Sequence, residues 1–372
     1  MGYNTAEFLE VMRQTLPVIR FDTIQMMLKQ NDWPTLRVLF DDNLRDIPGG
    51  KYLEESWYYD LEADAVSDRW FKPGTIRQTT LTDNSVKGTV PIANGGYSVG
   101  YIEEETLANR SPAQIIDVIK AREMTMKLRY LRGLAKDAWG YVDSSLDQTQ
   151  LFGYPMWIVP ITAAQMAASA GGAFQGANVA STVNSTLATT GSAGVDLSLS
   201  KYADLRNWNA GWTNSDGEIA QTDRVRIAET LYRLSFKAPD SMKDLEVPAF
   251  KKRVIFTNST MWTSLGNVKE QLNDNIGADI TKYRGSHLIN GIPVERVDAL
   301  DTADVDLRGT NPMYFINTDL IRLGVDKKKW MRKSKPQLTP NTTDSVSIFT
   351  DARCQLMAQD PQKCGAVISW AE

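Results

Sequence analysis

The stretch "SPAQIIDVIKAREMTMKLRYLRGLAKDAWGYV" at residues 111–142 has the pattern of one long amphipathic helix. Ser111 is a favourable N-cap, and Pro112 suits the first helical position because its missing N–H needs no partner there. Apolar residues recur at spacings of three and four, which places them along one side of a helix. They form two adjacent rows: Ile116, Ile119, Met126, Tyr130 and Leu134, then Leu128, Leu131, Ala135 and Ala138. We expect a single helix over 112–139.

The charged side chains of this helix are net positive by three. Two interpretations are open. The charges form the solvated face of a core helix, or they form a basic face that meets a polyanion or an acidic neighbour.

Composition limits the class of protein. The chain has 372 residues, 42% of them hydrophobic, and a formal net charge of −4. It can bury a core, and it lacks the basic excess of a dedicated nucleic-acid binder. Only Cys354 and Cys364 are cysteines; their spacing permits a disulfide, but such sparse usage fits a reducing compartment. We see no signal peptide and no apolar run long enough to cross a membrane, and we expect a soluble, cytoplasmic chain.

The remaining segments alternate between helix and strand patterns. Residues 8–28 predict two short helices, and a Gly-Gly break follows at 49–50. Residues 51–106 read as strands and turns, with Tyr97, Val99 and Tyr101 on one strand face. This segment has little apolar mass of its own, so it needs a neighbour to lie upon.

The second half predicts a central α/β unit and a closing β meander. Residues 163–194 contain no charged residue and are rich in Ala, Ser, Thr and Gly, which indicates a long loop or thin extended layer. Residues 197–240 predict helix, with Ile219, Val225, Ala228, Leu231 and Leu234 near one face. Residues 251–275 read as strand, turn and helix, residues 285–300 as two strands around Asn290-Gly291, and residues 312–372 as strands. The fold class is α+β.

The sequence contains few of the residues and motifs that are typical of catalytic sites. One histidine, His287, and two cysteines cannot supply a zinc site, and no phosphate-binding glycine motif is present. His287 has no nucleophile-elbow motif to accompany it. We predict no catalytic residue, no metal and no cofactor.

The strongest basic cluster is "GVDKKKWMRKSK" at 324–335. Its cations surround Trp330 and are Lys327, Lys328, Lys329, Arg332, Lys333 and Lys335. Cations beside an aromatic ring suit phosphate and base contacts, which makes a DNA-facing patch one interpretation. A solvated turn, or contact with an acidic neighbour, is the other.

The order of these parts resembles the major capsid proteins of tailed bacteriophages, the Hong Kong 97-type fold. The segments that carry the resemblance are "GGYSVGYIEEETLANRSPAQIIDVIKAREMTMKLRYLRGLAKDAWGYV", "KKRVIFTNSTMWTSLGNVKEQL", "HLINGIPVERVDALD", "NPMYFINTDLIRLGVDKKKW" and "SIFTDARCQLMAQDPQKCGAVISW". The resemblance spans nearly the whole chain and lies in the order of its parts, since no single motif is specific.

The resemblance implies a set of domains. These are an N-terminal arm (1–50), an extended loop (51–106), a peripheral domain (107–160 and 311–372) with a spine helix (112–139), and an axial domain (161–310) that includes 163–194. In the family, the extended loop lies across the adjacent subunit, so Tyr97, Val99 and Tyr101 become candidate contacts between subunits.

The same resemblance implies a shell-building role and its partners. Copies are expected to form hexamers and pentamers of an icosahedral head around double-stranded DNA, with assembly in the host cytoplasm and residence in the virion. Residues 1–50 are shorter than the cleaved scaffold segment of some family members, so we expect a separate scaffolding protein and a portal. The sequence leaves open whether a decoration protein binds. Some members crosslink Lys to Asn between subunits; nothing in this sequence selects such a pair.

Two rival functions remain open. One is an encapsulin-like compartment, which shares the fold and holds cargo enzymes. The other is an α/β enzyme that works through scattered carboxylates.

Overall fold

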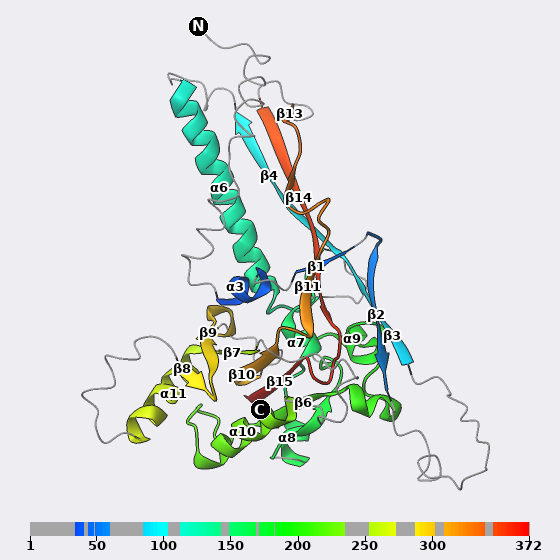
Figure 1. Ribbon diagram of the computed structural model, residues 1–372, viewed down its shortest axis with the longest axis vertical. Coiled ribbons are helices and arrows are strands. Elements are labelled where there is room, and N and C mark those ends of the chain that lie inside the picture. The colour runs from blue at the N-terminus through cyan, green and yellow to red at the C-terminus, as the bar shows by residue number, and fades with distance from the viewer. Residues whose placement is uncertain are drawn as a thin grey trace, which may run out of the picture.

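The computed structural model has an elongated stalk and a rounded body, with the C-terminus in the body (Figure 1). The stalk is one long helix beside a narrow sheet. The body is a second sheet between a helical layer and a layer of irregular chain. The structure describes residues 34–40, 44–47, 49–59, 85–102, 112–142, 149–168, 171–181, 183–234, 253–272, 287–301, 309–338 and 345–371.

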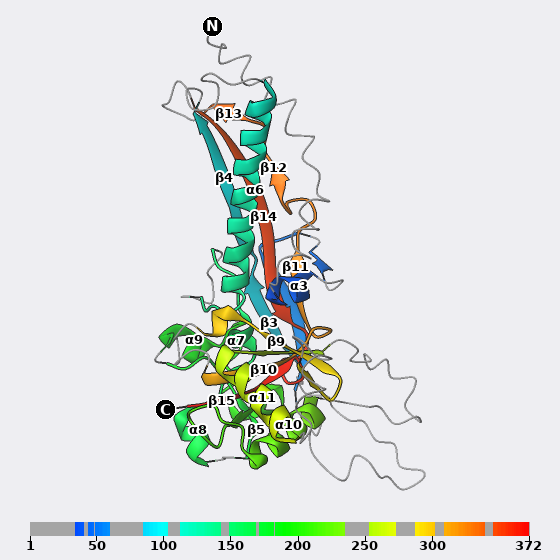
Figure 2. The same cartoon turned by 90° about the vertical axis from the view of Figure 1, so that its left-hand side faces the viewer.

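The stalk is built around β14 (Ser345–Ala358), the longest strand described. Along one side it pairs antiparallel with β4 (Ala93–Ile102) over the full length of β4. Along the other it pairs in turn with β13 (Gln337–Leu338), β12 (Arg332–Lys333) and β11 (Ile321–Val325), and β11 also pairs with β1 (Arg45–Asp46). Helix α6 (Pro112–Asp137) runs along this sheet and contacts β4 (Figure 2).

The body contains a mixed seven-stranded sheet. Its strand order is β5 (Ala173–Gly176), β6 (Asn207–Gly211), β15 (Gly365–Trp370), β10 (Thr310–Asn317), β7 (Arg253–Thr257), β9 (Ile292–Arg296) and β8 (His287–Ile289).

Side chains alternate across this sheet, as strand geometry requires. Ile255 and Phe315 face α10 (Gln221–Leu234) and α11 (Ser259–Leu272). Phe256 and Tyr314 point to the opposite face and belong to the larger core, which joins body and stalk. Trp139, just beyond α6, lies at this junction: its ring packs against Tyr154, Phe256 and Tyr314 at centroid distances of 5.1, 5.4 and 5.2 Å.

A separate β-hairpin lies near the base of the stalk and forms a two-stranded sheet of its own. Its strands are β2 (Tyr52–Tyr58) and β3 (Ser85–Pro91). Trp57 fixes it in place, because its indole N–H donates to the Ala358 carbonyl at 3.2 Å and its ring meets Trp157 edge-on at 6.1 Å. The hairpin is therefore anchored at the point where β14 enters the body.

The shorter helices connect these parts. They are α3 (Pro34–Phe40), α7 (Tyr154–Trp157), α8 (Ala163–Ala168), α9 (Ser185–Thr190), and the 3₁₀ helices η2 (Ser200–Leu205) and η4 (Asp298–Leu300).

Several predictions from the sequence are confirmed. The long helix ends at Asp137, two residues before the expected end. The strand and helix expected in 251–275 are β7 and α11. The turn between β8 and β9 is formed by Asn290 and Gly291, whose φ angles of 50° and 80° are the left-handed values that Asn-Gly turns favour.

The domain boundaries stay a prediction, and the sheets divide the strands of two expected segments. Within 51–106, β2 and β3 form a separate hairpin, but β4 belongs to the stalk sheet. Within 311–372, β11 and β14 lie in the stalk, whereas β10 and β15 lie at the centre of the body sheet with elements of 161–310. The closing strands therefore do not form one meander. Pairings between segments this distant leave no local pattern in the sequence.

Three local predictions also need correction, and a fourth is not tested. Residues 163–194 contain α8, β5 and α9 rather than a plain loop; Asn184 caps α9 by accepting from the backbone N–H groups of Thr186 and Leu187. The helical segment expected over 197–240 contains the strand β6 as well as η2 and α10, because β6 pairs with the distant β15. Val225 is 66% exposed and does not share the buried face of α10. The helices expected in 8–28 lie outside the described residues and stay a prediction.

Candidate assembly surfaces

The basic cluster of 324–335 lies on the stalk, between β11 and β13. Three of its cations form ion pairs within the chain. Lys327 pairs with Asp46 at 3.0 Å, Arg332 with Asp351 at 3.2 Å, and Lys333 with Glu123. The Trp330 ring lies 5.7 Å from that of Phe40. At these positions the structure supports the acidic-neighbour interpretation.

The other three cations, Lys328, Lys329 and Lys335, are exposed. Their contact with DNA stays a prediction.

The Lys333–Glu123 pair is buried. Glu123 is 1% exposed although it lies on the long helix, and the side chain of Lys333 is 23% exposed. Lys127, one turn after Glu123, is 6% exposed. Burial lowers the pKa of Lys127, the positive charge of Lys333 lowers it further, and Glu123 opposes both effects. One carboxylate thus compensates two cations where α6 meets β12.

Sequence analysis missed this cluster, since it assigned the charges of the helix to a solvated or outward basic face. A signal was present. Glu123 and Lys127 continue the spacing of Leu131, Leu134 and Ala138, which are the buried residues of the same helix. Charged residues in register with a buried row predict an internal ion pair.

The candidate inter-subunit contacts Tyr97 and Val99 face the chain's own long helix. The Tyr97 ring lies 6.2 Å from that of Tyr130 on α6, and burial raises the pKa of Tyr97 to about 12. Val99 is 3% exposed. Both side chains pack within the chain, and their role as contacts between subunits stays a prediction. Tyr101 lies on the same strand, and its side chain falls outside the described part of the chain.

Exposed large apolar side chains occur at several separate places on the surface. Tyr52 and Tyr58 lie on the hairpin strand β2, with Tyr58 70% exposed. Leu338 and Phe349 lie on the stalk sheet, 49% and 44% exposed. The stalk and the hairpin therefore expose apolar side chains that neighbouring molecules can cover.

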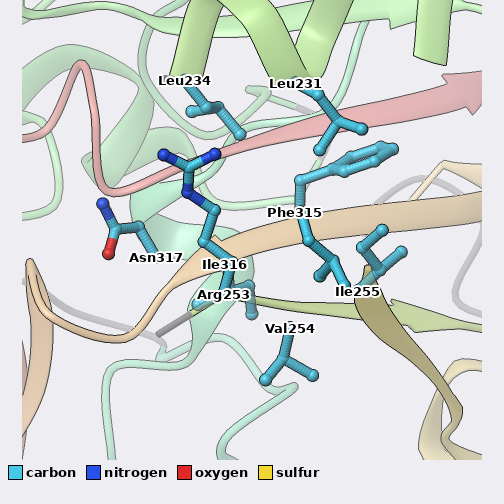
Figure 3. A pocket seen from close by; sticks show the side chains of 9 residues that line it. Leu231, Leu234, Arg253, Val254, Ile255, Phe315, Ile316 and Asn317 are labelled. Carbon is cyan, nitrogen blue, oxygen red and sulfur yellow. The ribbon is translucent and has the colours of Figure 1, made fainter. Parts of the chain in front are cut away.

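A small cavity lies between α10 and the body sheet (Figure 3). Its volume is about 10 Å³, room for roughly one water molecule and far below the size of a substrate pocket. Arg253 Nε and Asn317 Nδ2 are buried at its wall without a hydrogen-bond partner.

The cysteines of the described chain are free and buried, so the disulfide that their spacing permits is not formed. Burial raises the pKa of Cys354 to about 12 and that of Cys364 further. Within the described ranges, no three His, Cys, Asp or Glu residues gather as a metal site would need. No helix in those ranges is long and apolar enough to cross a membrane.

Comparison with known proteins gives no match at the level of sequence. No protein-family profile matches the chain, and no curated protein does.

Solved structures give a clear match in fold. The capsid of a native GTA particle is 11% identical, with a TM-score of 0.54 over 90% of each chain. The cyanophage A-1(L) capsid is 14% identical, with a TM-score of 0.52 over 90% of this chain and 92% of that chain. The capsid of an empty GTA particle is 11% identical, with a TM-score of 0.52 over 90% and 97%.

The likeness at these identities concerns the fold, and it extends over nearly the whole chain. The chain has the Hong Kong 97-type fold of tailed-phage capsid proteins, and this prediction from the sequence is confirmed.

Proposed function

We propose that this chain is the major capsid protein of a tailed bacteriophage, a coat subunit that assembles into hexamers and pentamers of an icosahedral head around double-stranded DNA. The observation that carries the proposal is the fold, which matches phage and GTA capsids along 90% of the chain. Fold alone does not fix function, so the architecture has to agree.

The architecture agrees. The stalk sheet extends away from the body (Figure 1), and the stalk and the hairpin β2–β3 leave large apolar side chains exposed, which suits subunits that are covered by their neighbours.

The partners follow from the same role. Copies of the chain are the main partner. A separate scaffolding protein and a portal are further expected partners, a decoration protein stays open, and the virion is the expected location after assembly in the host cytoplasm. Non-specific contact with DNA is made by the exposed Lys328, Lys329 and Lys335, which form no ion pair among the described residues.

The test is to express the chain with and without the neighbouring genes of its source and to examine the product by sedimentation and negative-stain microscopy. Closed shells of uniform diameter support the proposal. A small monomer under every salt condition contradicts it and favours the enzyme alternative.

The contents of the shells then distinguish a phage head from an encapsulin-like compartment. Genome-length DNA in particles from the natural source supports a phage head. Shells that hold a cargo protein and no DNA support the encapsulin-like alternative.

A further inference from the structure

The outer face of α6 carries a row of basic side chains. Arg122, Arg129, Arg132 and Lys136 follow one another at intervals of seven, three and four residues, which places them along one side of the helix. Arg129, Arg132 and Lys136 are exposed, and Arg122 is partly exposed. At a rise of about 1.5 Å per residue, this basic row is about 21 Å long.

The basic row lies opposite the side of α6 that packs on the stalk sheet. The buried residues of the helix include Glu123, Lys127, Leu131 and Leu134. With about 3.6 residues per turn, these positions and the basic row are about half a turn apart around the helix axis. The row therefore points away from the sheet that α6 covers (Figure 2).

The charge of this face is positive, although the whole chain has a net charge of −4. Among the side chains described for α6, Asp137 is the exposed carboxylate next to the row. Glu123 is buried on the opposite side, where it pairs with Lys333. Arg129 and Lys136 form no ion pair with another described residue. The cations of the row thus outnumber the carboxylates that their own helix places beside them.

The side chains between these cations indicate which partner fits the row. Thr125 and Gly133 lie on the same face and are exposed, and no large exposed apolar side chain of the described surface lies on α6. A protein partner generally buries an apolar centre, whereas contacts with phosphates need only cations and polar groups. The row also contains no aromatic ring on which an unpaired base could stack. A straight cationic row of this kind suits the closely spaced phosphates of a double helix.

We propose that the basic row of α6 contacts the phosphate backbone of double-stranded DNA without reading its sequence, so that this face of the stalk lines the inside of the shell. The inference rests on the proposed function, because the enclosed genome supplies the duplex. It assigns a DNA-contacting surface to α6 in addition to the exposed lysines of 324–335.

Chemical labelling of particles from the natural source tests the inference on the unaltered protein. Acetylation of Lys136 by an N-hydroxysuccinimide ester, followed by mass spectrometry, is expected to be about threefold slower or more in DNA-filled particles than in particles emptied of DNA, because phosphates cover the amine. Lys51, an exposed lysine outside α6, is the internal control and should react equally in both. Equal labelling of Lys136 in filled and emptied particles would overturn the inference.

Binding of unassembled subunits to a duplex gives a second measurement. Affinity for a fluorescent duplex of about 30 base pairs is measured by anisotropy at several salt concentrations. Arg129→Gln with Lys136→Gln removes two phosphate contacts, which should lower the slope of log affinity against log salt by about two and the affinity by about tenfold. Lys51→Gln with Lys201→Gln makes the same change in net charge at exposed sites outside α6 and should leave the slope unchanged.

The outcomes separate this inference from the proposed function. If R129Q/K136Q subunits bind the duplex with an unchanged slope, the inference is wrong; if this variant binds DNA normally but no longer assembles, the row meets an acidic protein surface instead. Shells that form without DNA contact at α6 leave the proposed function standing. A chain that forms no shell contradicts the proposed function, and the duplex measurement on subunits still decides whether the row binds DNA.

Discussion

Replacing Glu123 by Gln is expected to weaken the stalk strongly, because it removes the carboxylate that, among the described residues, compensates Lys127 and Lys333. Breaking a fully buried ion pair by removing one partner costs about 3–5 kcal/mol. The Lys333 side chain is 23% exposed, so contact of its ammonium group with water offsets part of this free-energy cost. We expect the free energy of unfolding to fall by about 2–3 kcal/mol.

The loss of unfolding free energy in Glu123→Gln should depend on the two cations that remain, Lys127 and Lys333. In the Glu123→Gln background, Lys333→Met removes one of two like charges that then face each other without an anion. A double-mutant cycle is therefore expected to show a coupling energy of about 1 kcal/mol or more between positions 123 and 333.

The matched control is Arg332, the residue before Lys333. Its pair with Asp351 is exposed, with side-chain exposures of 59% and 55%. Arg332→Gln should change the free energy of unfolding by less than about 0.5 kcal/mol, as exposed pairs do.

The assay is urea unfolding of unassembled subunits, followed by tryptophan fluorescence and by amide exchange in β12. Glu123→Gln and Arg332→Gln with equal, small effects would refute the reasoning, since the buried pair would then contribute no more than a surface pair.

Three further predictions concern the body and its junction with the stalk. Trp139→Phe removes the 2.9 Å bond from the indole N–H to Thr35 Oγ1 and part of a fully buried ring, and it should cost about 2 kcal/mol in urea unfolding; an unchanged midpoint would contradict the packing described. Asp223→Asn should cost about 2–3 kcal/mol by circular-dichroism melting, because the buried carboxylate accepts from the backbone N–H groups of residues 213 and 220; a loss below 0.5 kcal/mol would count against this role. Cys354 and Cys364 should not react with a thiol reagent at pH 8 in the folded chain, and both should react in denaturant. Since burial raises the folded pKa of both thiols above the unfolded value of 9.0, their contribution to stability is present below pH 9 and declines as the pH rises towards 12; rapid labelling of the folded chain would contradict their burial.

Local patterns predicted the elements that depend on neighbouring residues. Ser111 and Pro112, with the apolar rows that follow, predicted α6, and Asn290-Gly291 predicted the turn between β8 and β9. Such signals arise from capping and backbone preference, which act within a few residues.

Long-range pairing could not be predicted in the same way. The register that joins β4 to β14 connects the first third of the chain to its end, and no local preference encodes it. The same holds for β6, which carries Asn207 and Asn209 into the body core. Asn207 both accepts from the Val159 N–H at 3.1 Å and donates to the Val159 carbonyl at 3.2 Å, so a distant segment satisfies a polar residue that reads as a surface residue.

For the candidate surfaces too, local sequence identified the residues, whereas their contacts come from distant segments. The basic cluster was visible in the sequence, but the acidic partners Asp46, Glu123 and Asp351 come from three separate elements. Tyr97 and Val99 were placed correctly on one strand face, but the helix that covers this face is supplied by the fold.

The central claim is that copies of this chain complete their packing against one another in a curved shell. Cryo-electron microscopy of particles assembled from the purified chain tests it most directly. The account predicts closed icosahedral particles in which this fold occupies five-fold and six-fold positions. Particles without such symmetry, or a chain that remains monomeric at every protein and salt concentration, would contradict it.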